Sequence, residues 1–168
     1  MNLNKKIGGN LTIYYKILLA VDGSEDCIEA AKQVLEIQKK YKSTVVAFYS
    51  IESYSHPQKI IPVGMSITNE DDGSSQRFTK IRKELKDKGE RILSEIRKMF
   101  NTKNGQFETR LIKNERPEDY IERIVIEEKF DLVALGFRSE HSKSKKITKG
   151  KVAQKIFDDS PCRVLIAR

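Results

Sequence analysis

Hydrophobic residues along the chain fall into short apolar runs that are separated by longer segments with helical spacing. The runs are rich in Val, Leu and Ile and too short to suggest helices, so they predict strands buried on both faces of a sheet. A further segment, in which Phe107, Thr109 and Leu111 alternate with polar residues, also predicts a strand. The five predicted strands are 13–21, 43–51, 107–111, 130–136 and 162–167.

Four amphipathic helices are predicted between these strands. Ser24 is placed to cap the first, and Pro117 suits the first turn of the third. Each helix has one apolar stripe. The stripes are Ile28, Ala31, Leu35 and Gln38; Ile81, Leu85, Ile92 and Ile96; Ile121, Ile124, Val125 and Glu128; and Val152, Ile156 and Phe157. Gly89 is predicted to be a mild weakness in the second helix, which should run from 79 to 100.

Alternating strands and helices predict an α/β fold, a doubly wound open sheet of five parallel strands with helices on both faces. Residues 13–168 should form a single domain, preceded by a polar, flexible N-terminal extension at 1–12. Residues 52–79 interrupt the alternation of strands and helices. They contain prolines, glycines and a Ser/Asp/Asn cluster, which predict an irregular insertion.

Two ends of the sequence carry a family resemblance. Tyr15–Glu25 reads YKILLAVDGSE, while the C-terminal part contains Asp131–Gly136 (DLVALG), then Gly150, then Ser160–Ile166 (SPCRVLI). In order and spacing these segments resemble the universal stress protein family, over roughly residues 14–52 and 106–168. The resemblance implies a fold like that of the adenine-nucleotide alpha-hydrolases. It also implies binding of ATP or AMP (with Mg²⁺ if ATP) and a homodimer through the C-terminal strand.

Asp22, Ser50 and Gly136 are predicted at carboxyl ends of strands, the edge where open α/β sheets bind ligands. From the residues alone, Asp22 suits two roles equally, as an acceptor for a ribose hydroxyl or as a brace for the first helix turn. The resemblance favours the ribose, because an aspartate in this position contacts nucleotide in the family. It also implies that the backbone at Ser50 reads adenine.

Phosphate binding needs glycines, so that backbone amides can approach the oxygens, and a helix N-terminus to supply partial positive charge. The family pattern is Gly, two residues, Gly, nine residues, Gly and then Ser or Thr. Here the first and last glycines are Gly136 and Gly150, whereas Ser139 replaces the middle glycine and Lys151 the final hydroxyl. We expect the Cβ of Ser139 to weaken the phosphate loop. Arg138 and Lys151 add positive charge there, within a basic loop that is equally well interpreted as a solvated surface.

Net charge, hydropathy and the remaining residue types limit the possible functions but indicate no further site. The 168 residues carry a formal net charge of +8, which favours anionic partners. No run is long enough to span a membrane, and the first fifteen residues do not resemble a secretory signal. No catalytic constellation or metal-ligand spacing occurs, so at most slow nucleotide hydrolysis is expected, and Cys27 and Cys162 are predicted to be ordinary core residues of a cytoplasmic protein.

Three functions compete. The first is a regulatory module whose ligand is an adenine nucleotide. The second is a dimeric stress or scaffold protein that does not bind ATP, which would fit the altered glycine pattern. The third is a nucleic-acid binder, which charge alone suggests; the basic loop lacks aromatic residues after Phe137 on which bases could stack, so this function ranks last.

Overall fold

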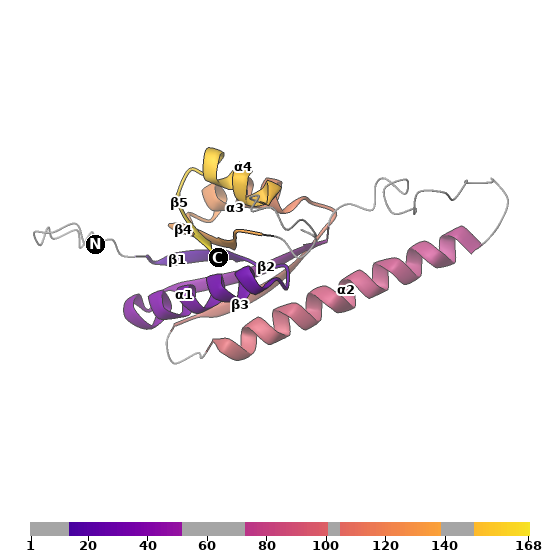
Figure 1. The fold of residues 1–168 in the computed structure, drawn as a ribbon, viewed down its shortest axis with the longest axis horizontal. Coiled ribbons are helices and arrows are strands. Elements are labelled where there is room, and N and C mark those ends of the chain that lie inside the picture. The colour runs from indigo at the N-terminus through magenta and orange to yellow at the C-terminus, as the bar shows by residue number, and fades with distance from the viewer. Residues whose placement is uncertain (1–13, 52–72, 101–104, 139–149) are drawn as a thin grey trace, which may run out of the picture.

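The computed structural model describes residues 14–51, 73–100, 105–138 and 150–168. Its described part forms a five-stranded, all-parallel sheet in the order β3-β2-β1-β4-β5 (Figure 1). The strands are β1 (Lys16–Ala20), β2 (Thr44–Ile51), β3 (Phe107–Lys113), β4 (Leu132–Gly136) and β5 (Arg163–Ala167). The predicted α/β fold is therefore confirmed, with β1 at the centre of the sheet.

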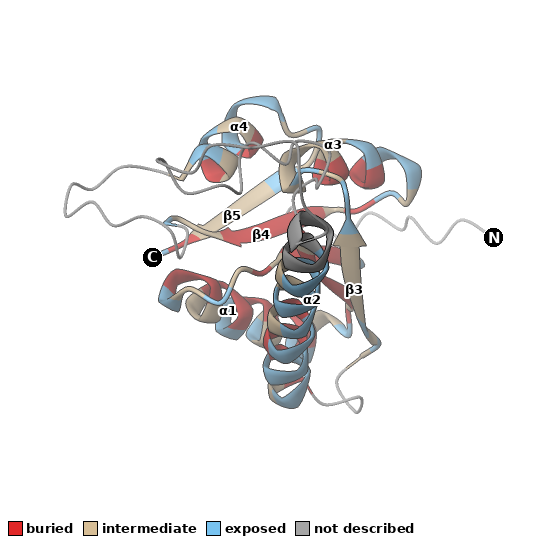
Figure 2. Ribbon diagram, turned by 90° about the vertical axis from the view of Figure 1, so that its right-hand side faces the viewer, coloured by how far each residue is buried: buried red, intermediate tan, exposed pale blue. Residues whose placement is uncertain are grey.

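Two pairs of helices cover the sheet, one pair on each face (Figure 2). The helices are α1 (Glu25–Tyr41), α2 (Gly73–Met99), α3 (Pro117–Glu127) and α4 (Lys151–Asp159). Two hydrophobic clusters result, one beneath α1 and α2 and the other beneath α3 and α4. Ile17 and Leu19 point into the first cluster and Leu18 into the second, which explains why the β1 sequence is continuously apolar.

The stripes of three helices differ in detail from the prediction. In α1 the buried positions are Asp26, Cys27, Ala30, Ala31, Val34 and Gln38, whereas Ile28 and Leu35 are only half-buried. In α4 the buried residues are Ala153 and Ile156, and Phe157 is 59% exposed on the neighbouring face. In α3, Tyr120 joins the predicted apolar residues. A stripe is wider than a single residue, so sequence spacing fixes its centre only to within a position.

Helix α2 begins earlier than predicted. It starts at Gly73, so residues 73–79 are helical and do not belong to an irregular insertion. The rest of that predicted insertion, 52–72, and the predicted N-terminal extension, 1–12, lie outside the described residues. The N-terminal half of α2 extends beyond the sheet (Figure 1). Among the α2 residues whose burial the structure describes, from 79 onward, the buried ones lie in the C-terminal half.

Gly89 in α2 is a packing contact, which corrects its interpretation as a weakness. A Cβ at this position would lie 2.7 Å from Leu111 Cδ1 and 2.7 Å from Tyr49 Cδ1. The missing side chain therefore lets α2 approach β2 and β3 closely. This close packing offsets the small loss of helix propensity that glycine causes.

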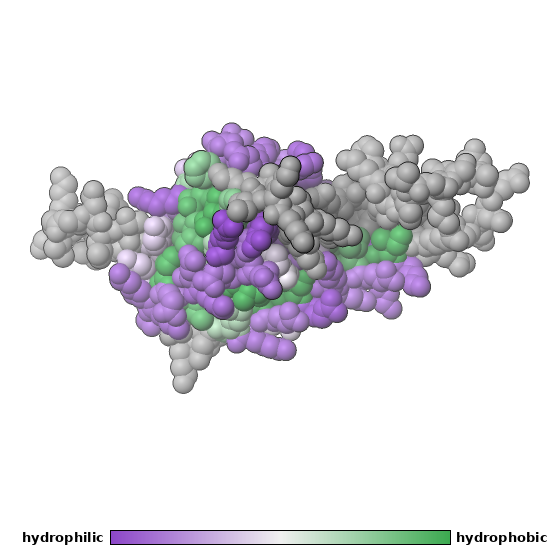
Figure 3. All heavy atoms as spheres, viewed as in Figure 1, coloured by the Kyte–Doolittle hydropathy of each residue, from purple (hydrophilic) through white to green (hydrophobic). Residues whose placement is uncertain are grey.

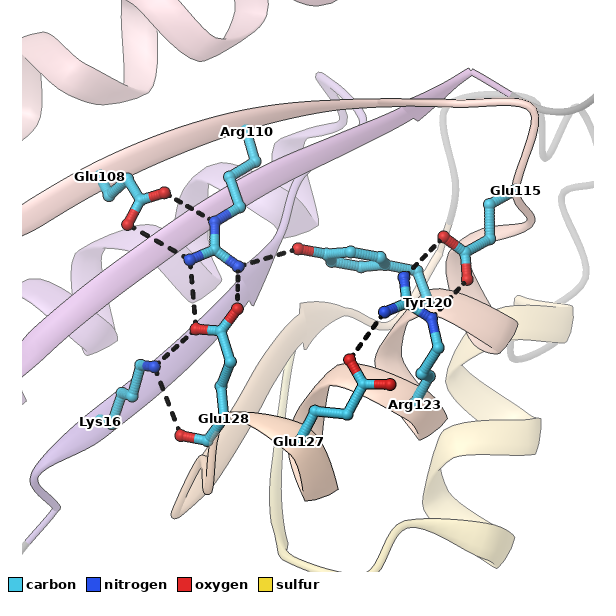
Figure 4. A network of polar contacts seen from close by, with 8 residues as sticks. All are labelled: Lys16, Glu108, Arg110, Glu115, Tyr120, Arg123, Glu127 and Glu128. Carbon is cyan, nitrogen blue, oxygen red and sulfur yellow. Dashed lines mark hydrogen bonds and ion pairs between the residues drawn. The ribbon is translucent and has the colours of Figure 1, made fainter.

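A group of charged side chains holds the β3 edge of the sheet to the end of α3 (Figure 4). The Arg110 guanidinium on β3 donates to both carboxylate oxygens of Glu128, directly after α3, and to the Tyr120 hydroxyl. The Lys16 ammonium on β1 donates to the same carboxylate at 2.6 Å. Three elements that are distant in sequence are thereby joined, and Glu128 enters the α3 stripe as an ion-pair partner of these two cations.

Candidate functional site

The turn after β1 is built around Asp22 and Gly23. The Asp22 carboxylate accepts a hydrogen bond from the Ser24 amide through Oδ1 (2.9 Å), and the Ser24 hydroxyl accepts from the Cys27 amide (3.1 Å) as the N-cap of α1. Gly23 has φ 89°, a conformation that side chains with a Cβ rarely adopt, and lies against Ile92 of α2. The bracing role predicted for Asp22 is thus present in the structure, with its side chain still half-exposed at the sheet edge.

Asp22 and Gly136 leave neighbouring strands at the same edge. Leu19 of β1 pairs with Ala134 of β4, so both chains reach the edge two to three residues later. The chain turns to opposite sides of β1 here, because β2 lies on one side of β1 and β4 on the other. In open α/β sheets such a reversal of strand order marks the ligand-binding crevice.

Gly136, the last residue of β4, lies against the start of α1. A Cβ there would be 2.8 Å from the Cys27 nitrogen and 2.9 Å from the carbonyl carbon of Asp26. Both neighbours are backbone atoms, which cannot move aside as a flexible side chain would. The glycine is therefore required for packing in the structure as it stands, whatever it contributes to a ligand.

The two glycines that survive from the family pattern are brought together. The Gly150 amide donates to the Phe137 carbonyl at 2.9 Å, and the Phe137 amide donates to Ala167 of β5 at 2.7 Å. Gly150 is the N-cap of α4 and supplies no capping side chain, and the first turn of α4 holds no acidic residue. The first turns of α1 and α3 each contain two acidic residues. The N-terminus of α4, with exposed Lys151 as its first residue, is thus more electropositive than either.

Arg138 is bound to Asp26 of α1. Its backbone amide and its Nε donate to Asp26 Oδ2 at 3.0 and 3.1 Å, and its Nη2 donates to Oδ1 at 3.0 Å. The side-chain hydrogen bonds from Arg138 outweigh burial and lower the pKa of Asp26, and the pKa of Arg138 is raised by the same bonds. The carboxylate therefore carries its full charge at neutral pH.

Ser50 is the next-to-last residue of β2, which ends at Ile51. Its hydroxyl donates to the Glu115 carbonyl and so connects β2 to the segment before α3. The side chain has a structural partner, which agrees with assigning only backbone groups here to a ligand. Ser139 and most of the basic loop lie outside the described residues.

Asp26 is the site residue that sequence reasoning missed. The stripe predicted for α1 begins at Ile28 and does not include it. A signal was available, because Asp26 stands four and eight residues before Ala30 and Val34, which are both fully buried on the sheet-facing side. A charged residue on that side needs a partner, and the sequence offers Arg138 just after β4.

Other features do not add to this site. An open groove between α3 and α4 is lined by Glu122, Ile126, Lys155, Asp159 and Pro161, toward the amino ends of the strands. Among the described residues, no group of three His, Cys, Asp or Glu side chains could hold a metal ion. Within the same residues, no helix is both long enough and apolar enough to cross a bilayer.

The fold and this edge define a doubly wound α/β protein in which Gly136 and the hydrogen bond from Gly150 to Phe137 lie at the carboxyl end of β4, next to β1. The chain belongs to the universal stress protein family, whose family model matches residues 14–168. A curated universal stress protein of Methanocaldococcus jannaschii is 25% identical over 166 residues, covering 99% of this chain and 89% of that protein.

Solved structures give the same result for the fold. The universal stress protein UspA from Lactobacillus plantarum superposes with a TM-score of 0.66 at 20% identity, covering 94% of this chain and 99% of its own. The universal stress protein from Archaeoglobus fulgidus in complex with dAMP gives 0.57 at 18% identity, covering 94% and 100%. A family member from Arabidopsis thaliana with AMP bound gives 0.56 at 16% identity, covering 91% and 90%.

Proposed function

We propose that this chain is a regulatory module that binds an adenine nucleotide at the carboxyl edge of β1 and β4. The observation that carries the proposal is the hydrogen bond between Gly150 and Phe137, which places the uncapped N-terminus of α4 beside the end of β4. Backbone amides at such a helix start bind phosphate oxygens, and Lys151 adds a full positive charge. The bound AMP and dAMP of two structural neighbours support this choice of ligand.

The proposed roles follow the position of each residue. Asp22 would accept a hydrogen bond from a ribose hydroxyl, and backbone groups near Ser50 would contact adenine. Amides near Gly136, Gly150 and Lys151 would hold phosphate. AMP and ATP (with Mg²⁺) are both candidates, and occupancy would alter the surface that this edge presents to a partner.

We further propose a homodimer through β5 in a cytoplasmic protein. Strand β5 pairs only with β4 among the described strands, so its other edge is open to a second copy. Val164, Leu165 and Ile166 are only partly buried there, and hydrophobic residues gather over this edge in the space-filling view (Figure 3).

Titration calorimetry with AMP and ATP tests the nucleotide proposal directly. We expect saturable binding of at least one of them, and Asp22→Ala should weaken it by about tenfold through loss of one hydrogen bond to a charged group. Mass spectrometry of the denatured protein would reveal any nucleotide that copurifies. No heat with either nucleotide, together with no copurified nucleotide, would favour the dimer that acts without ligand.

A further inference from the structure

The Asp26 carboxylate accepts hydrogen bonds from three donors of Arg138, at the beginning of the segment that follows β4. Asp26 accepts from the backbone amide, Nε and Nη2 of Arg138, all within 3.0–3.1 Å. The Asp26 side chain is 5% exposed, whereas that of Arg138 is 44% exposed. The acid is therefore fixed inside the molecule, and it holds the more exposed arginine against α1.

These three donors are of the kind that a phosphate group uses. A backbone amide directly after a strand, together with a guanidinium fork, binds oxyanions through charge-assisted hydrogen bonds. Here both are directed at Asp26, whose Cβ would be 3.0 Å from a Cβ built on Gly136. The carboxylate thus lies next to the crevice and stands where a phosphate oxygen would otherwise find its partners.

The charges around the pair do not cancel this effect. Glu25, exposed in the same first turn of α1, adds a second negative charge near Arg138, and Arg168 adds a positive charge near Asp26. Arg168 also lies over the Phe137 ring, 5.8 Å from its centroid. The α1 side of the crevice therefore has its strongest anion donors neutralised, while the first turn of α4 carries no acidic residue.

We propose that Asp26 is a specificity-determining residue that makes the crevice select adenine nucleotides with one phosphate over those with three. This inference rests on the proposed function. A single phosphate reaches the N-terminus of α4 and Lys151. The second and third phosphates of ATP need additional donors, and at the end of β4 they meet a carboxylate that already holds the Arg138 amide and guanidinium.

The experiment compares AMP and ATP affinities by calorimetry in EDTA for the wild type and four variants. The wild type should bind AMP more tightly than ATP. Asp26→Asn should raise the ATP-to-AMP affinity ratio by about tenfold, the equivalent of one charge-assisted contact. Arg138→Gln should lower that ratio, because it leaves the carboxylate without its cation. Glu25→Gln removes the same charge from the same helix turn but keeps the pair, and its ratio should stay within about twofold of the wild type.

Asp26→Asn and Arg138→Gln should change the ATP-to-AMP affinity ratio in opposite directions. This comparison distinguishes a role in specificity from a purely structural role. If the pair only stabilised the fold, Asp26→Asn and Arg138→Gln would shift both affinities in the same direction. Asp26→Ser is a second variant with the same expectation as Asp26→Asn, and thermal unfolding of each variant verifies that it is folded. A wild type that prefers ATP, or a ratio unchanged in both Asp26 variants, overturns the role of Asp26 alone. A wild type that binds neither nucleotide overturns the proposed function.

Discussion

Arg110 and Glu128 form a two-pronged ion pair between an edge strand and the end of a helix. Nη1 of Arg110 lies 2.6 Å from Oε1 of Glu128, and Nη2 lies 3.1 Å from Oε2 (Figure 4). Both side chains are less than a third exposed, at 22% and 28%. Because β3 has only β2 as a neighbouring strand among the described residues, this pair is a tertiary connection that its sheet hydrogen bonds cannot replace.

Glu128→Gln should therefore destabilise the protein by about 1–2 kcal/mol at neutral pH, a value that allows for solvent screening of a partly exposed group. Hydrogen bonds from Arg110, and next from Lys16, lower the pKa of Glu128 from 4.5 to about 2. A lowered folded-state pKa means that the stabilisation is complete above the unfolded value and is lost as the pH falls from 4.5 toward about 2.

Urea unfolding across this pH range measures the effect. The difference in unfolding free energy between wild type and Glu128→Gln should shrink as the pH falls. Glu36→Gln is the control, since Glu36 is 71% exposed and its ion pair among the described residues is with Lys39 in its own helix. A pH-independent difference for Glu128→Gln would contradict the assignment.

Gly89→Ala should lower stability by about 1 kcal/mol. The new Cβ would overlap Leu111 and Tyr49, at a cost of roughly 1–3 kcal/mol, which exceeds the helix propensity of up to about 1 kcal/mol that alanine gains. Chemical denaturation gives the net value. Ser94→Ala, on the exposed side of α2, is the control and should be neutral or stabilising.

Gly136→Ala should cost more than Gly89→Ala, roughly 3 kcal/mol or more without any nucleotide present. Its Cβ would meet backbone atoms of Asp26 and Cys27 rather than side-chain atoms, so relief requires moving α1. Thermal unfolding of the two variants, compared in the same buffer, gives their order. The reverse order would show that α1 shifts more easily than its packing indicates.

The sequence predicts most of this fold because each strand and helix has its own hydrophobic spacing. That spacing identifies the element even when the buried face is misplaced by one residue. The Asp22, Gly136 and Gly150 positions could likewise be placed, since turn residues directly follow or precede those segments. The partnership of Asp26 with Arg138 could not, because it depends on which side of α1 faces β4. The stripe predicted for α1 includes Ile28 and Leu35, whereas the buried side of the helix includes Ala30 and Val34, and Asp26 lies on that side.

Lys151→Ala should reduce nucleotide affinity by about ten- to hundredfold, the loss of one charge-assisted phosphate contact of about 1.5–3 kcal/mol. Lys98→Ala makes the same change of charge near the C-terminus of α2, and it should alter affinity by less than about twofold. Calorimetry with AMP measures both. Equal losses for the two variants would indicate a diffuse charge effect rather than a contact at the start of α4.

Light scattering should give the mass of a dimer at micromolar protein concentrations. Ile166→Lys introduces a charge into the partly buried β5 edge and should convert the dimer to a monomer. Phe157→Lys replaces an exposed aromatic residue on α4 and should leave the mass unchanged. A monomer mass for the wild type up to tens of micromolar would contradict the proposed dimer.

The two thiols differ in what must move before a reagent can reach them. Cys27, in the first turn of α1, is 1% exposed, and Cys162 is half-buried before β5; burial raises the pKa of both thiols. Alkylation of Cys27 therefore requires α1 to lift from the sheet, so its labelling rate reports how often that helix opens. Since Asp22, Cys27 and Asp26 share that one turn of chain, the same rate measures how firmly the rim of the crevice is held, with Cys162 as the internal standard.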